Sequence, residues 1–123
     1  MVINILEAAI KKILEDVTGL EVTPIFGVGL GPFVTYTHTP ISGGVVKQSQ
    51  IEVKIIDNDL DNAIFIRDSI TKVLDFTDKM PSLTVNDIHI RSELAGGGSL
   101  FNDSIQMWEL SLIFIMNWRR LNE

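Results

Sequence analysis

The segment that most constrains the fold runs from Ser104 to Arg119, where the side chains alternate between two faces. The first face is apolar without exception and consists of Trp108, Leu110, Leu112, Phe114, Met116 and Trp118. Successive side chains of a β-strand point to opposite sides, so this pattern predicts one long strand with one face in a core. Strands usually have about five or six residues. A strand this long must bend or extend past its own domain, and the second option brings it to a neighbouring subunit.

Length and composition indicate one globular domain covering residues 1–123, with 46% hydrophobic and 21% charged residues. The chain has no cysteine, which excludes disulfides and thiolate chemistry. The longest apolar run, Leu112–Met116, is far below the roughly 18 residues that a membrane-spanning helix needs. Glu7, Lys11 and Lys12 also interrupt the apolar residues near the N-terminus. We therefore expect neither a signal peptide nor a membrane partner.

The remaining periodicities predict two helices and three further strands. Apolar residues recur at helical spacing over 2–18 and 59–76, with Gly19 after the first helix and Asp57, Asn58 or Asp59 capping the second. Alternation predicts strands over 33–39, 45–56 and 83–93, and the glycine-rich segment Leu94–Asp103 reads as a hairpin tip. The order α-β-β-α-β-β predicts an α+β two-layer sandwich, with an antiparallel four-stranded sheet and two helices on one face.

The net charge of −6 is concentrated between Asp57 and Asp78, where six acidic residues accompany only two basic ones. Such a surface repels nucleic acid and anionic lipid. One interpretation is solubility alone. The other is a surface past which DNA slides without binding, formed by Asp57, Asp59, Asp61 and Asp68.

No segment matches a metal-binding or nucleotide-binding motif. Asp57, Asp59 and Asp61 are spaced like the start of a calcium loop, but Asn62 and Asp68 replace the required glycine and glutamate, so helix capping explains these acids better. The glycines of the segment 24–32 lack the third glycine of a dinucleotide fingerprint, and they lead into a strand rather than a helix.

Catalytic residues are not indicated either. His38 and His89 are the only histidines, and without cysteine they do not complete a zinc site. No serine lies in a nucleophile-elbow context. We therefore expect no metal, no cofactor and no enzymatic activity.

Several apolar residues lie at positions that are not expected to contribute to the core. Phe65 lies off the apolar stripe of the second helix. The segment between Pro24 and Pro32 alternates glycine with large apolar residues, and it is either a loop across the core or a loop that orders against a partner. The predicted interface residues are Phe26, Val28, Leu30, Phe65, Leu100 and Phe101.

Taken in order, four segments resemble one known family: LEAAIKKILEDVTG, FVTYTHTPISGGVVKQSQIEVKII, DNDLDNAIFIRDSITKVL and SIQMWELSLIFIMNWR. The chain resembles the tail terminator proteins of long-tailed bacteriophages, also called tail-to-head joining or tail completion proteins. The resemblance covers nearly the whole chain. It rests on length, element order and the character of the strands, and it assigns no role to an individual residue.

The resemblance implies a structural protein of the virion tail at the head–tail junction, assembled in the host cytoplasm. Such proteins form a ring, expected here to be a hexamer, that caps the head-proximal end of the tail tube and ends its polymerisation. The implied partners are the tail tube protein and a head-completion or connector protein, with DNA passing through the lumen without specific binding. The alternatives are another neck, head-closure or tail-tube protein, or a small-molecule-binding α+β regulatory domain with the segment 24–32 over a pocket.

Overall fold

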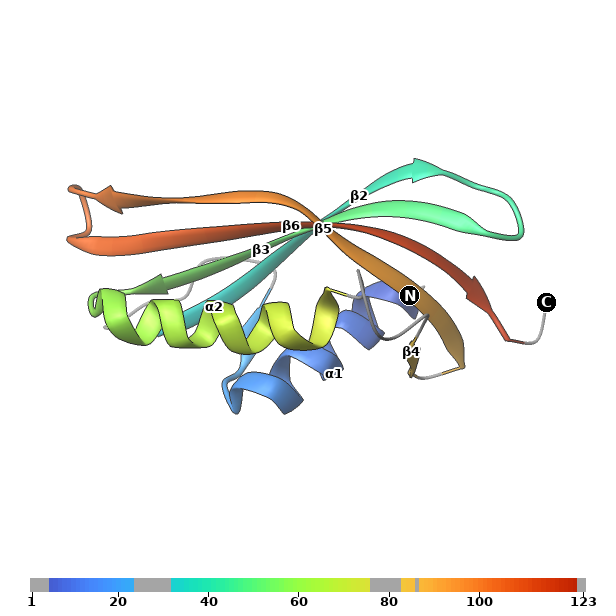
Figure 1. The fold of residues 1–123 in the computed structure, drawn as a ribbon, viewed down its shortest axis with the longest axis horizontal. Coiled ribbons are helices and arrows are strands. Elements are labelled where there is room, and N and C mark those ends of the chain that lie inside the picture. The colour runs from blue at the N-terminus through green and yellow to red at the C-terminus, as the bar shows by residue number, and fades with distance from the viewer. Residues whose placement is uncertain (1–4, 24–31, 76–82, 86, 122–123) are drawn as a thin grey trace.

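The computed structural model describes residues 5–23, 32–75, 83–85 and 87–121. In these residues the helices are α1 (Ile5–Thr18) and α2 (Leu60–Leu74). The strands are β1 (Val22–Thr23), β2 (Phe33–Ser42), β3 (Lys47–Asp57), β4 (Leu83–Val85), β5 (Ile88–Asn102) and β6 (Met107–Arg120). Both helices lie on the same side of the sheet (Figure 1).

The strands form one six-stranded sheet in the order β1-β2-β3-β6-β5-β4. Four of the five pairings between neighbouring strands are antiparallel, and β1 pairs in parallel with β2. The chain is α+β, but the predicted four-stranded sheet is wrong, because β1 and β4 extend its two edges. β1 has two residues, which is too few for alternation to show in the sequence. β4 and the start of β5 both lie in the single strand predicted over 83–93, which is two strands in the structure.

The predicted hairpin tip at Leu94–Asp103 is also wrong. Strand β5 continues to Asn102, with an irregular register between Leu94 and Gly96, and the turn covers residues 103–106. Glycine disfavours strands by propensity, which is why the segment resembles a loop. Pairing with β6 along its whole length overrides that preference.

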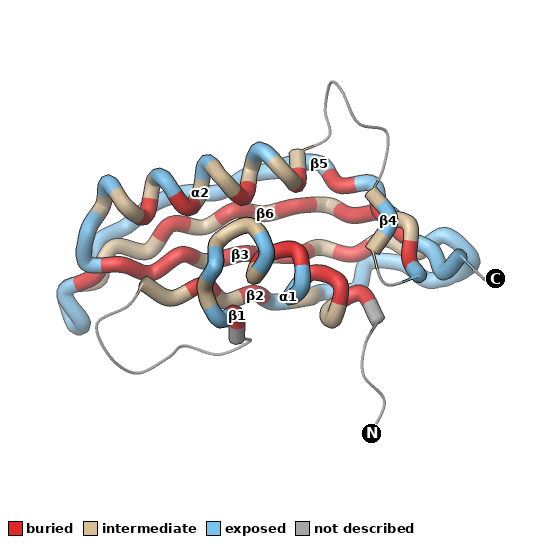
Figure 2. Tube along the Cα trace, turned by 90° about the horizontal axis from the view of Figure 1, so that it is seen from below, coloured by how far each residue is buried: buried red, intermediate tan, exposed pale blue. Residues whose placement is uncertain are grey.

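The predicted core face of the last strand is confirmed from Leu110 onward. Leu110, Leu112, Phe114, Met116 and Trp118 are all buried, and Trp108, the first residue of the predicted face, is partly buried against the core. Their register partners on β3 include Ile51, Val53 and Ile55, which are completely buried. The helices complete this core with Leu6, Ile10 and Leu14 from α1 and with Ala63, Ile66, Ile70 and Leu74 from α2. Figure 2 shows the buried residues along the middle of the sheet and on the sheet-facing sides of the helices.

The helix ends follow local rules of capping. Gly19 has a φ of 70° and donates its N–H to the carbonyl of Glu15 at 2.9 Å, so it ends α1 as predicted. At the start of α2 the side chain of Asp59 accepts the N–H groups of Asp61 and Asn62, at 3.0 and 3.4 Å.

Two hairpins end at opposite ends of the sheet. In the β3–β6 pairing Lys47 lies opposite Trp118, and Asp57 lies opposite Trp108. The β2–β3 turn is therefore beside the end of β6, whereas the β5–β6 turn is beside its start (Figure 1). We call residues 41–46 the first tip and residues 100–106 the second tip.

Candidate functional site

Both tips expose large apolar side chains. Ile41, Val45 and Val46 of the first tip are exposed, as are Leu100, Phe101 and Ile105 of the second. The sequence predicted Leu100 and Phe101 as interface residues but missed the other four. A usable signal was the pair of valines directly after the Gly43–Gly44 turn, because a hairpin turn has no need of apolar side chains.

At the second tip, Phe101 and Leu100 lie on opposite faces of β5. Phe101 is opposite Trp108, and the two rings pack edge to face with their centroids 5.1 Å apart. Leu100 is opposite Glu109, whose carboxylate accepts the Asn102 side-chain N–H at 2.7 Å and lies 3.6 Å from the Lys54 ammonium. The tip is thus held by contacts of its own and offers apolar side chains on both faces.

Beside the first tip lies a hollow of about 440 Å³. It is lined by His38, Pro40, Ile41, Ser42, Gly43, Lys47, Ser49 and Trp118. Ser49, only 2% exposed, lies 2.8 Å from His38 through Oγ and Nε2, and its Oγ accepts the Trp118 indole N–H at 3.1 Å. The Lys47 ammonium lies 5.2 Å from the centre of the Trp118 ring.

His38 and Ser49 are as close as a catalytic base and the serine that it activates, but their surroundings do not support catalysis. Ser49 is buried, and its hydroxyl oxygen already accepts a hydrogen bond from the Trp118 indole N–H, so it is not accessible to a substrate. Among the described residues no carboxylate bonds the other ring nitrogen of His38 to orient it as a base. The cluster joins β2, β3 and β6, and it is a structural contact.

The acidic residues around the start of α2 differ in exposure. The Asp57 carboxylate is 3% exposed and accepts the Asp59 backbone N–H at 3.1 Å and the Asn62 side-chain N–H at 2.7 Å. Asp57 therefore closes the start of α2 and is not part of the acidic surface to which the sequence assigned it. Asp59 and Asp61 are exposed, and Asp68 is exposed while lying 3.2 Å from Arg67.

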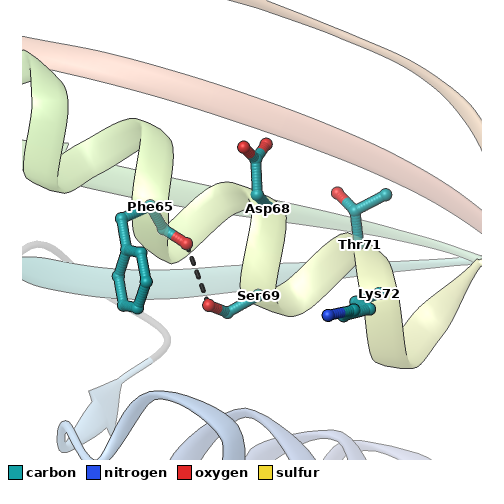
Figure 3. Close-up of a pocket in the computed structure, with 5 residues that line it drawn as sticks. All are labelled: Phe65, Asp68, Ser69, Thr71 and Lys72. Carbon is teal, nitrogen blue, oxygen red and sulfur yellow. Dashed lines mark hydrogen bonds between the residues drawn. The ribbon is translucent and has the colours of Figure 1, made fainter.

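Phe65 is 70% exposed on α2 and lines a shallow hollow of about 440 Å³ with Asp68, Ser69, Thr71 and Lys72. The Ser69 hydroxyl donates to the Phe65 carbonyl at 2.9 Å. In Figure 3 the Phe65 ring and Lys72 lie on either side of Ser69, and Asp68 points away from the ring. The polar groups do not converge on one point, so the hollow has the character of a contact surface.

The remaining predicted interface residues, Phe26, Val28 and Leu30, lie outside the described residues. Within the described ranges no group of three or more potential ligand side chains is placed to hold a metal ion. The described helices include none that is both long and apolar enough to cross a membrane. Burial raises the pKa of the Tyr36 hydroxyl, and the charges of Glu7 and Glu15 act in the same direction.

No protein-family model matches the chain, and no curated protein matches it. Among solved structures, the fold matches a chain of the "Virion of native gene transfer agent (GTA) particle", with a TM-score of 0.68 and 14% sequence identity. The match covers 92% of this chain and 93% of that chain. At this identity it shows a shared fold over nearly the whole length of both chains.

Proposed function

We propose that the chain is a structural virion protein whose ring caps the head-proximal end of a phage tail tube, ends tube polymerisation and joins the tail to the head. The observation that carries the proposal is the shared fold with a chain of a virion particle, which extends over 92% of the residues. The resemblance of the sequence to tail terminator proteins gives the specific role within a virion. Neither a cofactor nor an enzymatic activity belongs to this role.

The exposed tips support an assembling protein. Six large apolar side chains at the two tips contact water in the isolated chain, and burying them against partners is favourable. A ring also needs two unlike patches on each subunit, since heterologous contacts close when the rotation between neighbours closes. The two tips, at opposite ends of one sheet, meet that requirement. Phe65 remains a predicted contact to a neighbouring subunit.

The exposed acids on α2 suit a channel for DNA. Asp61 and Asp68 are two helical turns apart, so they project on the same side of α2. On the lumen side of a ring they would repel phosphate groups and keep the duplex mobile. Asp59 is exposed beside them, but it also caps the helix.

The lumen assignment is tested with the double variant Asp61→Lys and Asp68→Lys, which keeps the caps of α2 intact. We expect virions that assemble but eject DNA slowly and infect poorly. The control is Asp16→Lys at an exposed position of α1. Normal ejection and infectivity by the double variant would exclude a lumen position for these acids.

The ring itself is tested by native mass spectrometry with negative-stain microscopy across protein concentration, with and without purified tail tubes. We expect single six-fold rings that do not stack, and tubes that stop growing once capped. Rings that stack into long tubes would instead identify a tail-tube protein. Tubes that elongate normally in the presence of the protein would refute the terminator role.

A further inference from the structure

The two ends of the sheet carry opposite charge. Apart from the buried Asp57, the described residues beside the second tip and the start of α2 include four acids and one base: Asp59, Asp61, Asp103, Glu109 and Lys54. Among the residues that the structure describes, three bases and one acid lie beside the first tip and the end of β6: Lys47, Arg119, Arg120 and Asp87. Opposite ends of one subunit are therefore electrostatically complementary to each other, which directs association end to end.

The shapes of the two ends also differ in a complementary way. The second tip exposes Phe101 and Ile105, with the exposed acid Asp103 between them in the chain. The first tip has the hollow, whose wall contains Pro40, Ile41 and Trp118 with the cation of Lys47 at its edge. An apolar projection with an acid thus has a counterpart in an apolar hollow with a base.

We propose that the second tip of one copy docks in the hollow beside the first tip of the next copy. The proposal rests on the ring of the proposed function and names the two surfaces that form it. Each contact between two copies buries one tip and one hollow. A row of docked copies still has a free tip at one end and a free hollow at the other. Association therefore continues until the chain closes on itself.

The test uses two variants that each disable one surface. The tip variant carries Asp103→Lys and Ile105→Ser, and the hollow variant carries Ile41→Ser and Lys47→Ser, so the two disabled surfaces do not attract each other. By sedimentation velocity, we expect the self-association of each variant to be at least about tenfold weaker than that of the wild type. An equimolar mixture should form a heterodimer and nothing larger, because only one intact tip and one intact hollow remain to pair.

Two further variants separate charge pairing from damage to the fold. Asp103→Lys combined with Lys47→Glu in one chain exchanges the two charges and should restore association. Asp16→Lys makes the same change of charge on α1 and should leave association unchanged. Circular dichroism verifies that every variant is folded before the mixing experiment.

The outcomes distinguish this inference from the proposed function. A mixture of the two variants that stays monomeric while the wild type associates would overturn the docking. Rings formed by the tip variant as readily as by the wild type would overturn it too. Neither result argues against the terminator role. Wild-type protein that stays monomeric even on tail tubes would overturn the docking as well. A heterodimer in the mixture, combined with wild-type rings that fail to stop tube growth, would support the docking and refute the terminator role.

Discussion

Replacing Ser49 with alanine tests whether the cluster at the first tip stabilises the fold. Ser49 is the acceptor for the Trp118 indole N–H at 3.1 Å and the partner of His38 at 2.8 Å. Its neighbour across β6 offers a matched control. Ser49 and Ser92 both lie opposite Met116, one on each side of it, and both are buried. The Ser92 hydroxyl, however, has no hydrogen-bond partner among the described residues.

The expected cost follows from which groups lose a partner. Trp118 is 9% exposed, so its indole N–H is left without an acceptor in Ser49→Ala. A buried donor without a partner costs about 1–3 kcal/mol. His38 is half-buried and can bond water instead, so it adds little. Removing the unpaired Ser92 hydroxyl should be neutral or stabilising, by up to about 1 kcal/mol.

The assays are thermal unfolding and urea unfolding, both followed by far-ultraviolet circular dichroism, since Trp118 fluorescence itself changes with its surroundings. For a chain of 123 residues, a loss of about 1 kcal/mol in the free energy of unfolding lowers Tm by about 4 °C. Ser49→Ala should therefore melt about 4–12 °C lower, whereas Ser92→Ala melts at or above the wild-type temperature.

A double-mutant cycle with Trp118→Phe isolates the indole contact. With the donor already removed, Ser49→Ala should cost about 1 kcal/mol less than it costs in the wild type. Equal losses of stability in the Ser49 and Ser92 variants, or an unchanged cost in the cycle, would show that the hydroxyl does not hold the indole.

Three further predictions concern the backbone, a titrating group and a helix end. A Cβ on Gly97 would overlap the Ser111 carbonyl oxygen, whereas a Cβ on Gly98 would face open space. Gly97→Ala should therefore lower the free energy of unfolding by about 1–3 kcal/mol and raise hydrogen exchange in the second tip. An equal loss of stability in Gly98→Ala would contradict this prediction. The raised pKa of Tyr36 means that the folded state holds its proton more tightly, so the free energy of unfolding falls as the pH rises above 10.0. Tyr36 is the only tyrosine, so phenolate absorbance follows it directly, and Tyr36→Phe should remove this part of the pH dependence. Asp59→Ala removes the cap of α2 and should lower stability by about 0.5–2 kcal/mol in thermal unfolding, and an unchanged Tm would show that the cap contributes nothing.

The elements that the sequence predicted well are those whose pattern repeats. Helix α1 ends at Gly19 as expected, and the alternating residues of β6 are buried as a face. β1 was missed because two residues carry no period, and β4 was merged with the start of β5 in the single strand predicted over 83–93. The segment Leu94–Asn102 was misassigned because its pairing with β6 is a tertiary contact that glycine propensity opposes.

The candidate surfaces were predicted less completely than the fold. Phe65 was predicted to be exposed because helical spacing defines one apolar stripe on the helix, and Phe65 lies outside it. The hollow beside the first tip was not, since it joins His38, Ser49 and Trp118 from three strands, and no spacing in the sequence reports that meeting. Asp57 was misplaced because its local spacing matches its exposed neighbours, whereas its burial depends on Asn62 and the start of α2.

The strand order also has a consequence for how the chain folds. β6 follows the other five strands in sequence, yet it lies between β3 and β5 near the middle of the sheet. Its pairing with β3 joins residues about fifty to seventy positions apart, so a large loop must close before the central ladder can form. Until β6 arrives, the β2–β3 hairpin has an open edge and no central neighbour. Folding should therefore be slow and limited by the docking of β6, and a chain shortened before that strand should aggregate rather than fold in part.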